Sequence, residues 1–295
     1  MMRDFVGYGR NPPAVKWPGG ARLAVSFCIN YEEGAERSPL DGDEYPERFS
    51  EVPYGWDVKT RDLATESIYE YGSRVGIWRI LHLFNHQGIR TTFYACARAL
   101  ERNPEAAREI ARTGHEICSH GERWDEHWRM TREEEHQSIR RAVQSLERTT
   151  GQRPVGWYCR YAPSLYTREL LAEEGFLYDS DSYADELPYY VKVHGRDFLV
   201  LPYTLDVNDF PFWANRYSTG HDFYQYAKDS FDYLYRESQT KPRMFSVGLH
   251  LRIIGRPGRF VGLEKLVAYV KRFPDVWITR RVDIAKWWLE HVRPD

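Results

Sequence analysis

The sequence lacks a strong net charge, a long hydrophobic run and any signal-peptide pattern. Its 295 residues carry a formal net charge of −2 at pH 7, which gives no sign of a nucleic-acid or membrane-surface partner. No apolar run is long enough to span a bilayer, and the beginning, MMRDFVGYGRNPP, is polar and rich in proline and glycine. These absences predict a cytoplasmic protein that binds neither nucleic acid nor membranes.

Cysteine is scarce as well, and no two cysteines form a C-x-x-C pair. The four cysteines are widely spaced, at Cys28, Cys96, Cys118 and Cys159. In a chain without an export signal, we interpret them as reduced, buried small residues.

Aromatic residues, in contrast, are abundant. They make up 15% of the chain, with ten tryptophans and twenty-one tyrosines, and many lie in loop-like stretches such as DELPYYV, residues 185–191. Aromatic loops either wall a small-molecule pocket or bury themselves in loop and subunit contacts. The sequence is compatible with both.

Strand-like apolar runs alternate with helical patterns along nearly the whole chain. The first strand is predicted at 21–29, a helix at 66–87 and the next strand at 91–96. About eight such β units with helical crossovers predict an α/β fold with a parallel sheet closed, or nearly closed, into a barrel. We expect one domain over 1–295, with an N-terminal extension and an insertion at about 30–65 that forms a lid or an interface.

Polar residues cluster where the predicted strands end, and in a parallel barrel these ends meet at one mouth. Glu32 and Glu33 are the main candidates, because one of two carboxylates after a buried strand must point toward the mouth. A lone histidine such as His250 can be structural or functional. The other strand-end residues are Asn30, Tyr31, His120, Glu122, Arg123, Arg160, Pro163, Ser164, Asp179, Asp181, Asp206, Asn208, Asp209 and Arg252.

The stretch HEICSHGERWDEHW, residues 115–128, suggests a metal site because it holds three histidines and four carboxylates. Its histidines, at 115, 120 and 127, match no helical ligand pair. In a helix, seven residues advance about 10 Å, too far for His120 and His127 to share a metal easily, although an irregular loop could bring them together. A metal site, metal-free acid–base chemistry and a polar loop all stay open.

With these residues lined up, the chain resembles the polysaccharide deacetylase superfamily, the NodB-homology fold. Within it, the likeness is greatest to allantoinases of purine catabolism and to cyclic imide hydrolases. It covers almost the whole chain and rests on segments such as SFCINYEEGAER, GHEICSHG, LPYTLDVNDF and GLHLRIIGRPGR. The resemblance implies a distorted (β/α) barrel of about seven to eight parallel strands and a homotetramer.

The family's first two motifs imply roles for four positions. Its Thr-Phe-Asp-Asp motif places the base at Glu32 and a metal carboxylate at Glu33. Its His-x-x-x-His motif places a metal histidine at His120, whereas Trp124 stands where the second histidine is expected. A zinc or another divalent ion, if bound, would thus be held by Glu33 and His120 with an incomplete ligand set.

The later motifs imply an arginine and an acid. Arg160 and Pro163 match the Arg-x-Pro-Tyr motif with one extra residue between them, and His250 matches the acid of the Leu-x-His motif. The surrounding CRYAPSLY differs from the usual allantoinase pattern, so the exact substrate stays open.

The resemblance implies a hydrolase that opens a small cyclic amide ring, such as allantoin, a hydantoin-like compound or a cyclic imide. We expect Glu32, or Glu33 in its place, to act as the base with a pKa raised by burial and like charge. His250 is expected to act as the acid, and Arg160 to orient the substrate or the base. The expected substrate-binding residues are His120, Trp124, Tyr31 and Pro163. N-deacetylation of an amino sugar or polysaccharide and non-catalytic ligand binding are the alternatives.

Overall fold

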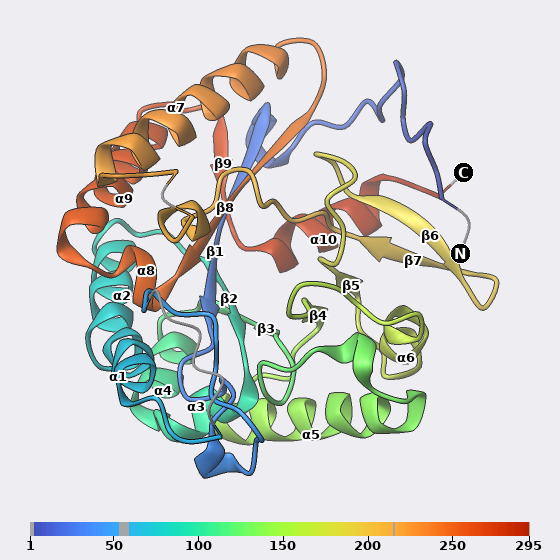
Figure 1. Cartoon of the computed structure of the whole chain (residues 1–295). Coiled ribbons are helices and arrows are strands. Elements are labelled where there is room, and N and C mark those ends of the chain that lie inside the picture. Colours follow the sequence, from blue (N-terminus) through green and yellow to red (C-terminus); the bar gives the residue numbers. More distant parts are fainter. Residues whose placement is uncertain (1–2, 53–58, 215, 295) are drawn as a thin grey trace.

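The structure, a computed structural model, describes residues 3–52, 59–214 and 216–294 (Figure 1). Its strands are β1 (Leu23–Tyr31), β2 (Thr92–Ala95), β3 (Glu116–Ser119), β4 (Gly156–Trp157), β5 (Tyr178–Asp179), β6 (Tyr189–Val193), β7 (Arg196–Val200), β8 (Arg243–His250) and β9 (Val276–Ile278). Within the described residues they form one sheet in the order β6-β7-β5-β4-β3-β2-β1-β8, and β9 pairs with β1. Every described pair is parallel except β6–β7. The predicted α/β fold with a distorted, mostly parallel barrel is confirmed.

Helices surround the curled sheet on its outer side (Figure 1). They are α1 (Leu63–Tyr71), the π-helix η3 (Gly72–Gly76), α2 (Ile77–His86), α3 (Ala97–Arg102), α4 (Pro104–Arg112), α5 (Arg132–Thr150), α6 (Thr167–Glu173), α7 (Gly220–Glu237), α8 (Leu251–Ile254), α9 (Pro257–Val270) and α10 (Arg281–His291). None of the described helices combines the length and apolar character that a membrane crossing requires.

The local sequence explains where these helices begin and end. The Thr131 side chain accepts from the backbone N of Glu134, whose carboxylate accepts from the backbone N of Thr131, so a capping box opens α5. Gly151 ends α5 with a φ of 72°, a left-handed conformation that glycine adopts without strain. The helix predicted at 66–87 is longer and composite, because α1, η3 and α2 run on from Leu63.

The barrel is closed between β7 and β8 by an irregular segment. The backbone N of Gly248 donates to Val207 O at 2.9 Å, and the backbone N of Asp209 donates to Gly248 O at 3.0 Å. A Cβ on Gly248 would overlap the Asn208 side chain, so this approach requires glycine. The closure brings Asp209 beside the carboxyl end of β8, where His250 lies.

A buried polar network fills the opposite end of the barrel. Thr92 Oγ1 and Tyr178 OH donate to the two carboxylate oxygens of Glu116 at 2.6 and 2.7 Å. Glu116 also accepts from the backbone N of Val282 at 2.9 Å, which joins α10 to β3. Arg281, fully buried, donates to Ser246 Oγ at 3.0 Å and to carbonyl oxygens after β7. The predicted site residues Glu32, His120 and His250 lie at the other end, where β1, β3 and β8 end.

The insertion predicted at 30–65 runs from the end of β1 to α1, and its residues 53–58 lie outside the described part of the chain. Several ion pairs hold its described residues against the rest of the chain, and two of them show the arrangement. Asp41 pairs with Arg102 at 2.6 Å, and Glu47 pairs with Arg160 at 2.8 Å. The second pair is buried, so the insertion covers the region where Arg160 lies.

Glycines let the π-helix η3 lie directly against α8. A Cβ on Gly76 would overlap Leu251 O, and a Cβ on Gly255 would overlap the same oxygen. A Cβ on Gly72 would lie 2.6 Å from Glu33 Oε1. Because π-helices are rare and often occur at functional sites, this packing directs attention to α8 and to Glu33.

Replacing Gly76 with alanine should lower the free energy of unfolding by about 1–3 kcal/mol, because the new methyl group must displace the α8 backbone. Chemical denaturation measures the change. Gly258→Ala is the matched control, since a Cβ there meets nothing within 4 Å. Equal stability of the two variants would contradict this packing.

Candidate active site

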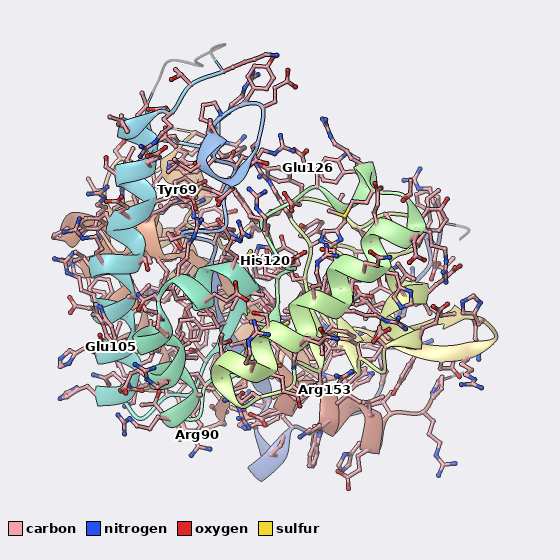
Figure 2. All side chains as sticks on the ribbon, turned by 90° about the horizontal axis from the view of Figure 1, so that it is seen from below. Tyr69, Arg90, Glu105, His120, Glu126 and Arg153 are labelled. Carbon is pink, nitrogen blue, oxygen red and sulfur yellow. The ribbon has the colours of Figure 1, made fainter. Side chains whose placement is uncertain are left out.

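Glu32 lies at the centre of a buried cluster at the mouth of the barrel. Its Oε1 is 3.4 Å from His120 Nε2 and 3.6 Å from His250 Nε2, and its Oε2 accepts from Arg252 Nη1 at 2.7 Å. None of these four residues is more than 4% exposed. His120 lies near the middle of the view in Figure 2. The structure thus brings together three residues for which the sequence predicted a role, and joins to them Arg252, which the sequence placed only among the strand-end residues.

Each histidine is held through its other ring nitrogen. His120 Nδ1 is 2.7 Å from Tyr158 O, so it donates there and leaves Nε2 facing Glu32. His250 Nδ1 is 2.6 Å from Asp209 Oδ1. Asp209 Oδ2 accepts from the backbone N of His250 at 2.8 Å and of Ile254 at 3.1 Å. Asp209 therefore orients His250, a role that its place after a predicted strand did not reveal.

Glu33 is adjacent to Glu32 in the chain but makes different contacts. Its Oε1 accepts from the backbone N of Arg252 at 3.0 Å and from Arg252 Nη1 at 3.2 Å. Its Oε2 accepts from the backbone N of Glu32 at 3.1 Å. With Gly72 packed against it, Glu33 faces η3 and α8, so it positions Arg252.

The two carboxylates also differ in their pKa values. Burial alone would raise the pKa of Glu32, but the charge of Arg252, followed by that of His250, lowers it well below its usual value. Burial raises the pKa of Glu33, and the like charge of Glu32 adds to this against the opposing charge of Arg252. The expected raised pKa is therefore wrong for Glu32 and fits Glu33.

Arg160 does not contact Glu32. Its Nη1 and Nη2 donate to the two carboxylate oxygens of Glu47 at 2.8 and 2.9 Å, and Nη1 also donates to Trp124 O at 2.8 Å. Its guanidinium lies 3.7 Å from the Trp124 ring centroid. Arg160 thus fastens the insertion to the barrel, whereas the contact with Glu32 belongs to Arg252, which the sequence marked only as a strand-end residue.

An aromatic wall adjoins the cluster. Trp124 is buried, and its ring centroid lies 5.9 Å from that of Tyr161 and 5.3 Å from the guanidinium of Arg252. Tyr161 has a φ of 59°, which is uncommon outside glycine and often found at functional sites. The remaining members of the wall are Phe49, Tyr69, Phe210 and Trp213.

One predicted substrate-binding residue, Tyr31, lies away from the cluster. Tyr31 points to the outer face of β1, where its hydroxyl lies 2.9 Å from Ser73 Oγ in η3. Side chains alternate between the two faces of a strand, so Glu32 points into the barrel and Tyr31 cannot. The assignment of Tyr31 is therefore wrong. Pro163 is half-buried in the loop after Arg160.

Of the three histidines in 115–128, only His120 reaches the cluster. His115 Nδ1 accepts from the backbone N of Thr91 at 3.0 Å, at the start of β3. His127 is buried, with its Nδ1 3.3 Å from Glu135 Oε1 and its ring edge-on to that of Trp157. Both are structural.

The donor set does not fit a zinc ion. Among the described residues, no group of three or more histidine, cysteine, aspartate or glutamate side chains could hold a metal. The positively charged guanidinium of Arg252 pairs with both Glu32 and Glu33, and Glu33 faces η3. Trp124 occupies the position of the expected second histidine. The pair Glu33 and His120 therefore does not form a metal site in this arrangement.

Residues 59–176 match a family model described as polysaccharide deacetylase. A Schizosaccharomyces pombe protein that carries the same family name is 38% identical over 310 residues, which cover 97% of this chain and 96% of that protein. The chain therefore belongs to the polysaccharide deacetylase family, as the resemblance predicted.

Two crystal structures are similar over nearly the whole chain. One, a Pseudomonas aeruginosa PAO1 protein that also carries the name polysaccharide deacetylase, is 47% identical with a TM-score of 0.94 over 98% of both chains. The other, Puue allantoinase, is 47% identical with a TM-score of 0.94 and covers 99% of this chain and 98% of its own. The protein is thus a hydrolase-type member of the polysaccharide deacetylase family.

The pKa of Glu36, a carboxyl group near Glu33, should make stability depend on pH. Burial raises this pKa from 4.5 to about 7, so the folded protein keeps a proton that the unfolded chain releases. The contribution of Glu36 to stability therefore falls as the pH rises through this range.

Glu36→Gln keeps an acceptor for the backbone N of Gly34 and removes the titration. Relative to wild type, it should gain up to roughly 3 kcal/mol above pH 7 and nothing below pH 4.5. Urea denaturation on both sides of this range measures the difference, and a difference that does not change with pH would contradict the assignment.

Proposed function

We propose that the protein hydrolyses a C–N bond in a small cyclic amide ring, such as allantoin, a hydantoin-like compound or a cyclic imide. The observation that carries this proposal is the buried Glu32, which lies between two histidines and an arginine beside an aromatic wall. The similarity to an allantoinase structure supports it.

Hydrolysis needs an activated water, a stabilised oxyanion and a proton for the leaving nitrogen. Glu32, which stays ionised at neutral pH, takes the proton from the attacking water. His250, fixed by Asp209, donates a proton to the departing ring nitrogen through Nε2. Because Nε2 of His250 and Oε1 of Glu32 are 3.6 Å apart, the proton taken by Glu32 can return through this histidine.

The burial of the cluster favours a small substrate over a polymer. Glu32, His120 and Arg252 are at most 1% exposed, whereas a polysaccharide chain requires an open groove. A flat ring also matches the aromatic wall. N-deacetylation, which the family name favours, is the second candidate. A role in purine catabolism, a homotetramer and a cytoplasmic location stay predictions.

Glu32→Gln should reduce kcat by at least about 10²-fold, because the amide cannot accept the proton from water. Steady-state kinetics and thermal denaturation of the same sample measure activity and folding. Glu36→Gln is the matched control, since it changes a buried carboxyl outside the cluster and should keep wild-type kcat. Near-normal turnover by a folded Glu32→Gln variant would contradict the assignment of Glu32 as the base.

The substrate class can be tested with one panel: allantoin, hydantoin, succinimide and chitooligosaccharide, each before and after chelation, with metal analysis of the same sample. We expect turnover of a cyclic compound that chelation does not reduce, because the donor set does not fit a metal. Activity confined to the acetylated sugar would refute the proposed substrate class. One equivalent of zinc with chelator-sensitive activity would refute the metal conclusion.

A further inference from the structure

Arg252 has hydrogen-bonding capacity that its neighbours do not use. Its side chain is fully buried, and Nη1 donates to Glu32 at 2.7 Å and to Glu33 at 3.2 Å. Among the described residues, Nε and Nη2 have no hydrogen-bond partner. Buried donors are nearly always paired in native proteins, so two free donors on one guanidinium require an explanation.

The aromatic rings around Arg252 do not explain its two unpaired donors. The guanidinium carbon lies 4.2 Å from the ring centroid of Tyr69, 5.3 Å from that of Trp124 and 5.2 Å from that of Trp213. Aromatic faces stabilise the charge, but they do not supply the oxygen acceptors that N–H groups in the guanidinium plane require. Nε and Nη2 share one edge of the planar group, the edge that presents two parallel N–H bonds to an oxygen ligand.

We propose that Arg252 is a catalytic residue that binds the carbonyl oxygen of the substrate through Nε and Nη2. This inference rests on the proposed function, and it names the group that stabilises the oxyanion. The water oxygen forms a bond to the carbonyl carbon as Glu32 takes its proton, and the C=O π electrons move onto the carbonyl oxygen. That oxygen receives the two N–H donors of Arg252.

The tetrahedral species then collapses. The oxyanion re-forms the C=O bond, the C–N bond breaks with its electron pair going to nitrogen, and His250 supplies the proton that the nitrogen takes up. The product is a ring-opened carboxylic acid, and no oxidant or other reactant is needed.

Arg252 is preorganised for this role. Glu33 accepts from its backbone N and from Nη1, so the carboxylate that faces away from the mouth holds the guanidinium in place. Glu32 accepts from the same Nη1. The guanidinium of Arg252 therefore fixes the position of the base, Glu32, relative to the donors for the oxyanion, Nε and Nη2. Donors fixed before the reaction stabilise developing charge without reorganisation.

Arg252→Lys tests the proposal, because lysine keeps the positive charge beside both glutamates and loses the two-donor edge. We expect the kcat on the best cyclic substrate to fall by at least about 10²-fold on the pH-independent plateau. Arg281→Lys is the matched control for replacing a fully buried arginine, because Arg281 lies at the opposite end of the barrel and should leave kcat unchanged.

A second measurement does not depend on how much of the variant folds. The ratio of kcat/KM for a carbonyl substrate and its thiocarbonyl analogue is measured within one preparation. Sulfur accepts hydrogen bonds weakly, so wild type should prefer oxygen strongly and Arg252→Lys should prefer it much less. If the lysine variant does not fold, the same ratio of kcat/KM values is measured for Arg252→Gln, whose side chain has a single NH2 group in place of the Nε and Nη2 edge.

An unchanged oxygen preference would overturn the proposal. So would a loss of kcat that disappears at high pH, since Arg252 would then act only through the ionisation of Glu32. These failures differ from failure of the proposed function, in which the wild-type protein itself would hydrolyse no cyclic amide.

Discussion

The buried contact between Glu32 and Arg252 is the interaction on which the mouth of the barrel depends. It joins the end of β1 to α8 across 220 residues of sequence, and both side chains are buried. Burying two charges is costly unless they are paired and hydrogen-bonded, and loss of one partner leaves the other uncompensated. The position of α8 against η3, which requires glycine at 76 and 255, is what allows this contact to form.

Glu32 and Glu33 are adjacent in the chain but have different roles in this pairing. Glu32 continues the inward-facing side of β1, so it meets both histidines and Arg252. Glu33 faces the helices and accepts from the backbone N–H groups of Glu32, directly after β1, and of Arg252 in α8. A strand that presents alternate residues to opposite faces cannot aim both carboxylates into the barrel. One is therefore a chemical group and the other a support.

The two arginines are divided in the same way. Arg160 binds Glu47 through both terminal nitrogens and stacks on Trp124, so it holds the insertion over the site. The Nε and Nη2 edge of Arg252, beside the aromatic wall, has no hydrogen-bond partner in the part of the chain that the structure describes. Glu32 and Arg252 are therefore buried beside the aromatic wall, where their charges are less screened than at the surface.

The sequence by itself determined the alternating α/β pattern, the capping box of α5 and the strand ends that carry Glu32, His120 and His250. These features are local, since periodicity, capping and strand termination are properties of neighbouring residues. Only the tertiary structure decided that Arg252 meets Glu32, that Asp209 orients His250 and that Arg160 pairs with Glu47. It also decided that Tyr31, the last residue of β1, faces away from the mouth, because the next residue, Glu32, is directed inward. Such pairings join residues far apart in the chain, and the packing of η3, α8 and the closing segment selects among the partners that the sequence offers.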